Sequence, residues 1–143
     1  MDHNAIRDML TQHDVRPSAQ RIYIMARLFE TRDHPTAEVV YQSVMEKLAT
    51  LSRTTVYNTM EALAETGVVR VLTIDDNEMR YDIDTSEHGH FRCTACKRVY
   101  DFNVGNLQSD GLDGFEIQRR DVFFHGVCDA CTHNTTNTKE CNN

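Results

Sequence analysis

Long apolar runs are absent from this sequence, and no stretch approaches the roughly 20 residues that a membrane-spanning helix needs. The first ten residues, MDHNAIRDML, also lack the basic and then apolar pattern of a signal peptide. We therefore expect a cytoplasmic protein with no membrane partner. Because thiols stay reduced in that compartment, its cysteines are expected to be metal ligands and not disulfides.

A net positive charge is also lacking, since 15 basic and 22 acidic side chains give a formal charge of −7. That total argues against nucleic-acid binding through a broad positive field. The acidity is uneven: residues 1–72 carry 8 basic and 9 acidic side chains, and residues 73–143 carry 7 and 13. The first half can still present a local basic face, so DNA binding would depend on geometry and a few arginines.

The 143 residues suffice for one ordinary domain or two small ones, and small modules often need a metal or a partner chain to stay folded. The amino-acid composition changes after Asp84, where histidine and cysteine begin to cluster. We predict a first domain at residues 1–83 and a second at 84–133. A polar, mobile tail is expected at 134–143.

Four amphipathic helices are predicted in the first domain. The first covers Ala5–His13, and Ser18, Thr36 and Ser52 are candidate N-caps for the other three. Gly67 is expected to end the fourth helix. Apolar residues at helical spacing mark the inner faces of the last three helices: Ile22, Met25, Ala26 and Phe29; Val39, Val40, Val44 and Leu48; Val56, Met60 and Leu63.

Strands are expected in both domains. Val68–Ile74 and Met79–Ile83, joined by a turn at 75–77, would form a hairpin behind the helices. Helices followed by one hairpin are typical of a winged helix-turn-helix. In the second domain we predict strands at Val99–Val104 and Glu116–Phe124, with a short helix or loop at Gly105–Gly114. The fold class is therefore α+β.

Two Cys-x-x-Cys pairs are the strongest signal in the sequence: Cys93 with Cys96, and Cys128 with Cys131. Each spacing lets a tight turn aim two sulfurs at one ion, and four thiolates favour a structural Zn²⁺ with no open position for catalysis. The alternative is redox-active or merely buried cysteines. Cys141 has no partner in this pattern and is expected to be a free surface thiol.

Histidines and carboxylates suggest a second metal site. His88 and His90 are two residues apart, so in a strand their imidazoles would face the same way. Asp82 precedes them and Asp101 follows. Nitrogen and carboxylate ligands suit iron, manganese or zinc. The alternative is a pair of exposed strand histidines.

A resemblance to the ferric-uptake-regulator superfamily rests on four runs that occur in that family's order and spacing. They are DHPTAEVVY, SRTTVYNTMEALAETGVV, RYDIDTSEHGHFRCTACKRVYDF and GVCDAC. The resemblance covers nearly the whole chain up to about His133. It implies an N-terminal winged helix, a hinge and a small C-terminal α/β dimerisation domain, and hence a homodimer.

The same resemblance implies a regulatory metal between the two domains, and it adds a ligand that the residues alone would not have suggested. Taken alone, His34 would be interpreted as a residue capping its own helix. By position in the family, the regulatory ligands are His34, Asp82, His88, His90 and Asp101. A metal that needs ligands from both domains would select one arrangement of them.

Within the superfamily, the sequence is most similar to the peroxide-sensing branch, which has aspartate at Asp82 and Asp101 and asparagine at Asn58. That branch implies Fe²⁺ or Mn²⁺ as the regulatory metal and oxidation of His34 and His88 by peroxide. Three departures from family patterns concern Ser18, His125, and a further metal site that we expect to be absent. That site would need ligands where this chain has Gly89, Arg119 and Arg120.

DNA contacts are expected from the helix at Ser52–Gly67, whose first turns would enter the major groove. The candidate residues on this helix are Arg53, Thr54, Thr55, Tyr57 and Asn58. Arg16, Gln20 and Arg21 are candidates for phosphate or minor-groove contacts. A dimer with two such helices would bind pseudo-palindromic, double-stranded operator DNA. The alternative is a solvated polar helix face.

Other functions were weighed against a peroxide-released repressor. An iron- or zinc-uptake repressor of the same superfamily would share its fold. A zinc-dependent enzyme, such as a deaminase, would need His-x-Glu and Pro-Cys-x-x-Cys, and neither is present. A zinc-stabilised protein-interaction module would leave the TTVYN helix unexplained. We therefore expect no catalytic residues and no small organic substrate.

Overall fold

The computed structural model describes residues 1–133, and the chain divides into two compact units, Met1–Thr85 and Ser86–Asn143. This division falls two residues after the boundary expected at 83. The predicted tail at 134–143 and its Cys141 lie outside the described residues. Within residues 1–133, no helix combines the length and the apolar character that crossing a bilayer requires.

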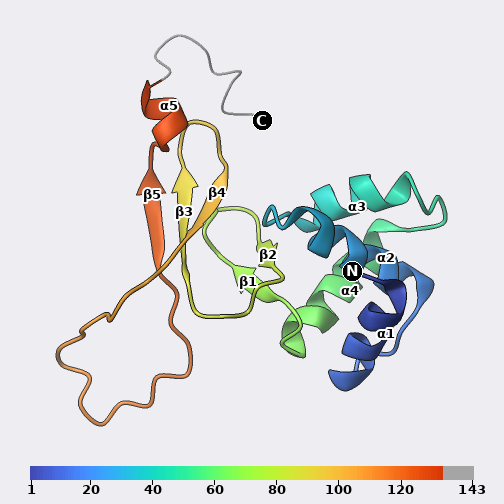
Figure 1. The fold of residues 1–143 in the computed structure, drawn as a ribbon, viewed down its shortest axis with the longest axis horizontal. Helices are drawn as coiled ribbons and strands as arrows, with labels where there is room; N and C mark the ends of the chain where they lie inside the picture. Colours follow the sequence, from blue (N-terminus) through green and yellow to red (C-terminus); the bar gives the residue numbers. More distant parts are fainter. Residues whose placement is uncertain (134–143) are drawn as a thin grey trace. The chain divides into compact units, whose positions relative to one another are not determined.

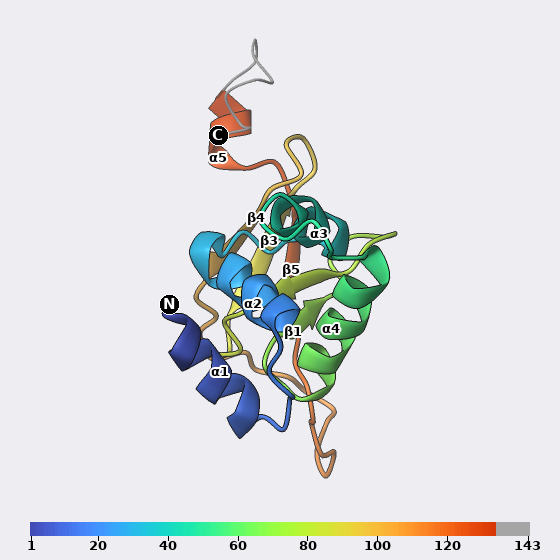
Figure 2. The ribbon, with the colours of Figure 1, turned by 90° about the vertical axis from the view of Figure 1, so that its right-hand side faces the viewer.

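The first unit contains the four predicted helices, α1 (His3–Gln12), α2 (Ala19–Thr31), α3 (Ala37–Met45) and α4 (Arg53–Glu65). The three predicted N-caps are confirmed. The side-chain oxygens of Ser18, Thr36 and Ser52 accept hydrogen bonds from the backbone N–H groups three residues later. Helix α2 contacts α1, α3 and α4 (Figure 2).

The core of the first unit follows the predicted apolar positions with two exceptions. Val56, Met60 and Leu63 on α4 are fully buried. Val39, expected on the inner face of α3, is 44% exposed, because Val40 and Val44 lie four residues apart and take that face. Leu48 was expected on the same helix, but α3 ends at Met45; Leu48 contacts the core from the following segment instead.

A short hairpin completes the first unit, with β1 (Arg70–Leu72) antiparallel to β2 (Arg80–Asp82). Both strands are shorter than predicted. Gly67 follows α4 with a φ of 76°, a backbone conformation that favours glycine, as expected for the end of this helix. Four helices and this hairpin form the winged helix-turn-helix that the sequence predicts.

The second unit is a three-stranded sheet of β3 (Gly89–Cys93), β4 (Val99–Phe102) and β5 (Phe123–Gly126), in the order β4-β3-β5. Strand β3 runs antiparallel to β4 and parallel to β5. A short helix, α5 (Asp129–His133), follows β5 and was not predicted. The long connection between β4 and β5 leaves the sheet at the end away from α5 (Figure 1).

The strand predicted at Glu116–Phe124 is wrong in extent, because only Phe123 and Phe124 of that range belong to β5. The parallel pairing of β5 with β3 begins at His90 opposite Phe123. Strand β3 begins at Gly89, only one residue before His90. Residues 116–121 therefore lie beyond the part of β3 that pairs with β5. Residues 105–114, expected to be a short helix or loop, form a loop.

Candidate metal centres and nucleic-acid interface

Four cysteines gather at one end of the second unit's sheet. Cys93 ends β3 and Cys96 lies in the turn before β4, while Cys128 and Cys131 belong to the segment after β5. The four sulfur atoms lie within 4.8 Å of one another, and the Sγ atoms of Cys96 and Cys128 are 3.9 Å apart. Four converging sulfurs are the donor set of a closed tetrahedral zinc site, and these residues fit Zn²⁺ once Cys131, which is disulfide-bonded in the structure, is reduced.

Backbone groups favour a thiolate at the centre of this cluster. The N–H groups of Cys96 and Cys128 donate to Cys93 Sγ over 3.4 and 3.3 Å. Burial alone raises the pKa of the Cys93 thiol, but donation by these two N–H groups and that of Ala95 outweighs it, and the pKa falls from 9.0 to about 6. The thiolate is the form of cysteine that binds zinc.

Hydrogen bonds tie the first cysteine pair to the last strand. The backbone N–H of Thr94 donates to the carbonyl oxygen of Gly126 over 2.7 Å, and the Thr94 hydroxyl donates to the same oxygen over 3.1 Å. Thr94 lies between Cys93 and Cys96, and Gly126 ends β5. In the sequence, 31 residues separate Cys96 from Cys128. These hydrogen bonds bring the two Cys-x-x-Cys segments to the same end of the sheet.

In the first unit, His34 and Asp82 form a buried pair. His34 Nε2 lies 3.6 Å from Asp82 Oδ2, and each side chain is 5% exposed. The other oxygen of Asp82 accepts the backbone N–H of Asp84 over 2.8 Å. Two ligands do not complete a metal's coordination shell. The alternative interpretation of His34 as a helix cap is wrong, because Thr36 is the N-cap of α3.

The backbone around His34 explains this pair. The Tyr81 N–H in β2 donates to the carbonyl oxygen of Pro35 over 3.0 Å. Arg80 Nη1 donates to the carbonyl oxygen of His34 over 3.3 Å. His34 has a φ of 51°, which is uncommon outside glycine although less so for histidine. Strand β2 therefore holds the segment before α3 so that His34 lies beside Asp82.

In the second unit, three predicted ligands converge. The Nε2 atoms of His88 and His90 each lie 3.4 Å from Asp101 Oδ1, and the two imidazole centroids are 4.4 Å apart. His90 is opposite Asp101 in the pairing of β3 with β4, which explains how they meet. Both histidines are buried, so the alternative of exposed strand histidines is wrong.

Local contacts orient these histidines. His88 Nδ1 lies 2.9 Å from the carbonyl oxygen of Ser86, which can only accept, so Nδ1 donates this hydrogen bond. Gly89, between the histidines, lies against the Phe102 ring, whose nearest atom would be 2.3 Å from an added Cβ. Phe102 in turn stacks on Phe124. A larger residue than glycine would therefore displace the Phe102 ring.

Five of the predicted DNA-contact residues share one cleft in the first unit. The cleft has a volume of about 510 Å³ and lies between the start of α2 and the first turns of α4. The cation Arg21 donates from Nη1 to the carbonyl oxygen of Arg16 over 2.8 Å. The predicted residues in the cleft are Arg16, Gln20, Arg21, Thr55 and Asn58.

The remaining predicted DNA-contact residues are exposed on α4: Arg53, Thr54 and Tyr57. Thr55 differs from the expectation, because its hydroxyl lies 2.8 Å from Ser52 Oγ and it is half-buried at the start of the helix. Arg53 also differs, since it forms an ion pair with Glu38 of α3. Sequence reasoning missed this pair, because its members lie on different helices.

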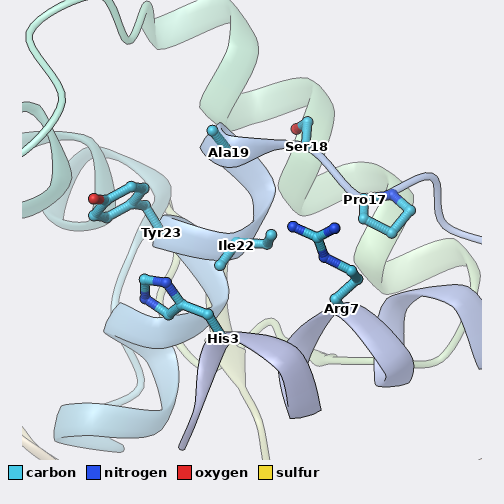
Figure 3. Close-up of a pocket in the computed structure, with 7 residues that line it drawn as sticks. All are labelled: His3, Arg7, Pro17, Ser18, Ala19, Ile22 and Tyr23. Carbon is cyan, nitrogen blue, oxygen red and sulfur yellow. The ribbon is translucent and has the colours of Figure 1, made fainter.

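A smaller pocket of about 280 Å³ flanks the start of α2 on the side of α1 (Figure 3). It shares Pro17 and Ser18 with the larger cleft. Arg7 extends from α1 toward the first turn of α2, and the rings of His3 and Tyr23 meet edge-on with centroids 5.6 Å apart (Figure 3). Arg7 is thus a further cation near the start of α2, and the sequence had not singled it out.

Comparison with known proteins identifies the family. The family model described as "Ferric uptake regulator family" matches residues 12–110. The chain belongs to the ferric uptake regulator family. It is 32% identical over 130 residues to the "Peroxide operon regulator" of Bacillus subtilis, covering 87% of this chain and 90% of that protein. It is 31% identical over 127 residues to the "Peroxide-responsive repressor PerR" of Staphylococcus epidermidis, covering 85% of each.

A solved structure of the ferric uptake regulator of Helicobacter pylori has the same fold, with a TM-score of 0.71 and 18% identity over 95% of this chain and 97% of that one. These findings confirm the family and the fold class predicted from the four sequence runs. One of these relatives is a peroxide-responsive repressor and the other is a peroxide operon regulator. This member of the ferric uptake regulator family is thus similar to regulators and not to enzymes.

Proposed function

We propose that this protein is a dimeric, metal-dependent repressor that binds pseudo-palindromic operator DNA and is released from it by peroxide. The observation that carries the proposal is the pair of incomplete ligand sets, His34 with Asp82 in one unit and His88, His90 and Asp101 in the other. Neither set fills a coordination shell, whereas together they provide five ligands. Relatives that respond to peroxide support the same function.

The four-cysteine cluster would hold a structural Zn²⁺ through Cys93, Cys96, Cys128 and Cys131. Its sulfurs converge, and N–H donation favours a thiolate at Cys93. A closed site of this kind contributes folding free energy and has no open position for a substrate. The zinc would hold β3, β5 and α5 together at one end of the sheet.

The two incomplete ligand sets would share one regulatory Fe²⁺ or Mn²⁺. Binding to ligands from both units would favour the arrangement of the two units in which all five ligands meet, and the ion's binding free energy would stabilise that arrangement. Asp82 and Asp101 supply carboxylate oxygen, and the histidines supply imidazole nitrogen; both donor types suit iron and manganese. The proposed domain arrangement, residues 1–83 for DNA and 84–133 for dimerisation, follows from this division of roles.

A homodimer is supported by the distribution of exposed apolar side chains. Of the eleven large apolar side chains that are exposed within residues 1–133, six lie between 107 and 127 in the second unit. An excess of exposed apolar side chains in one unit favours an interaction surface there. The six residues are Leu107, Leu112, Phe115, Ile117, Phe124 and Val127.

Operator DNA would be read by α4, with the cleft beside it contributing to backbone binding. Asn58 can pair with an adenine edge, and the methyl groups of Thr54 and Thr55 can touch thymine. Arg16, Gln20 and Arg21 would bind phosphate. A dimer presents two such helices, which accounts for a two-fold related operator.

Release by peroxide would act through the ligand histidines. Bound Fe²⁺ would supply the redox chemistry, in which peroxide gives one oxygen atom to an imidazole ring and leaves as water. His34 and His88 are the expected positions. An oxidised imidazole is a poorer ligand, so the regulatory ion would dissociate and the DNA-binding arrangement would no longer be favoured.

Metal-dependent DNA binding tests the proposal. The zinc-loaded protein with Mn²⁺ added should select a two-fold related sequence from a randomised duplex pool. Fluorescence anisotropy should then show binding to that sequence about 5- to 150-fold tighter with Mn²⁺ than without, the usual range of allosteric coupling. Mixed-sequence DNA is the control. Equal affinity with and without Mn²⁺, or no selected sequence, would contradict the proposal.

A further inference from the structure

Four side chains form a network between α3 and the start of α4. Glu38 accepts hydrogen bonds from two atoms of the Arg53 guanidinium, Nε to Oε2 and Nη2 to Oε1, each over 3.1 Å. Gln42 Nε2 donates to Glu38 Oε1 over 2.9 Å. The Arg53 guanidinium also lies 4.4 Å from the centroid of the Tyr41 ring. Arg53 is thus held on two sides, by a carboxylate and by an aromatic face.

Arg53 is the first residue of α4, in the part of the helix that should meet DNA. A carboxylate presents two oxygens to a guanidinium in the same fork that a phosphate does. Hydrogen bonds from Arg53 and Gln42 lower the pKa of Glu38, so its carboxylate stays ionised at neutral pH. Glu38 therefore offers Arg53 the same bidentate contact that the DNA backbone would offer.

We propose that Glu38 competes with DNA phosphates for Arg53 and so weakens binding to non-operator DNA. The proposal rests on the proposed DNA-binding function. On non-operator DNA, a phosphate contact by Arg53 would require Arg53 to leave Glu38. One ionic contact would then replace another, so the binding free energy would gain little. Operator DNA would be bound mainly through base contacts from α4, so Glu38 weakens operator binding less than it weakens non-operator binding. Glu38 is a specificity-determining residue in this account.

The pair is suited to such competition because it is open to solvent. Glu38 is 44% exposed and Arg53 is 57% exposed. Exposed ion pairs are weak, so a phosphate can displace Glu38 without unfolding α3 or α4. Elsewhere on α4, Glu61 is exposed and makes no ion pair within residues 1–133, which makes it a matched control for loss of one negative charge.

A double-mutant cycle on mixed-sequence duplex DNA tests the proposal with the full-length, zinc- and Mn²⁺-loaded protein. Four proteins are compared: the unmodified chain, Glu38→Gln, Arg53→Gln and the double variant. Glu38→Gln should tighten mixed-sequence binding roughly fivefold, the upper end expected for one exposed ionic contact. It should also steepen the dependence on salt concentration by about one counterion. Binding to the selected operator should tighten less, so the ratio of the two affinities should fall.

The cycle identifies Arg53 as the group that Glu38 controls. Arg53→Gln should change mixed-sequence binding little in the unmodified chain, and it should remove the whole gain in the Glu38→Gln background. Circular dichroism and thermal melting check that each variant folds. If Glu61→Gln gives the same gain, or if Arg53→Gln has equal effects in both backgrounds, Glu38 acts only through net charge and the inference is overturned. An unmodified protein that binds no duplex at all would instead refute the proposed function.

Discussion

Cys96→Ser is expected to lose zinc and, with it, the fold of the second unit. Within the described part of that unit, the buried side chains classed as hydrophobic are only Cys93, Val99 and Cys128, and two of these three are candidate zinc ligands. So small an apolar core cannot offset the entropy lost on folding, whereas structural zinc typically contributes about 10–16 kcal/mol in small modules. The variant should contain no zinc by mass spectrometry of the metal content.

The same variant should lose the dimer, because the proposed dimer surface lies in the unit that unfolds. Light scattering after gel filtration measures this, and hydrogen exchange should show loss of protection in β3, β4 and β5 while α4 stays protected. Ala95→Ser is the matched control, since it changes an exposed residue between two cysteines and keeps all four cysteines. A zinc-free Cys96→Ser protein that remains a folded dimer would refute a structural role for the cysteines.

Low peroxide is expected to release the Fe²⁺-loaded protein from operator DNA almost completely and to leave the Mn²⁺-loaded protein bound. Both ions accept the nitrogen and oxygen ligands offered by the five residues, so both should support binding before peroxide is added. They differ in that Fe²⁺ readily reduces peroxide and Mn²⁺ does so poorly. The Mn²⁺ form is therefore the matched control for oxidation elsewhere in the chain.

Peptide mass spectrometry identifies the residue that peroxide oxidises. The released Fe²⁺ form should gain one oxygen atom on the peptide that contains His34 or His88, and the four zinc cysteines should stay reduced because a closed site shields its thiolates. Equal release of both metal forms with oxidised cysteines and intact histidines would indicate a thiol-based sensor. No release by peroxide, with iron still controlling binding, would favour an iron-uptake repressor.

Features that depend on neighbouring residues could be predicted from the sequence. The N-caps at Ser18, Thr36 and Ser52 are examples, because a cap needs only its own side chain and an N–H group three residues later. The cysteine pairs are similar, since two residues between cysteines already define a turn. His88 and His90 could be paired from their spacing of two residues, although β3 begins at Gly89 and His88 lies just before it.

Features that depend on distant residues could not be predicted in this way. The start of β5 is set by where β3 begins, more than 30 residues earlier, and no local pattern in residues 116–121 reveals it. The Glu38–Arg53 pair spans 15 residues and two helices. His34 became a candidate ligand only through the family resemblance, because its place beside Asp82 depends on the contact between β2 and Pro35.

The central claim is that one ion takes ligands from both units, and the Mn²⁺ dissociation constant of two variants tests it most directly. Asp82→Ala removes a ligand from the first unit and His90→Ala removes one from the second. Asp84→Ala and His125→Ala are controls, because they remove an exposed carboxylate two residues after Asp82 and an exposed imidazole on β5, the strand that pairs with β3. Titration calorimetry on the zinc-loaded protein should show one Mn²⁺ per chain beyond the zinc. It should also show that Asp82→Ala and His90→Ala each weaken Mn²⁺ binding about 10- to 100-fold or more, while the controls match the unmodified chain. Unchanged Mn²⁺ binding in Asp82→Ala, with loss only in His90→Ala, would contradict a site shared by the two units.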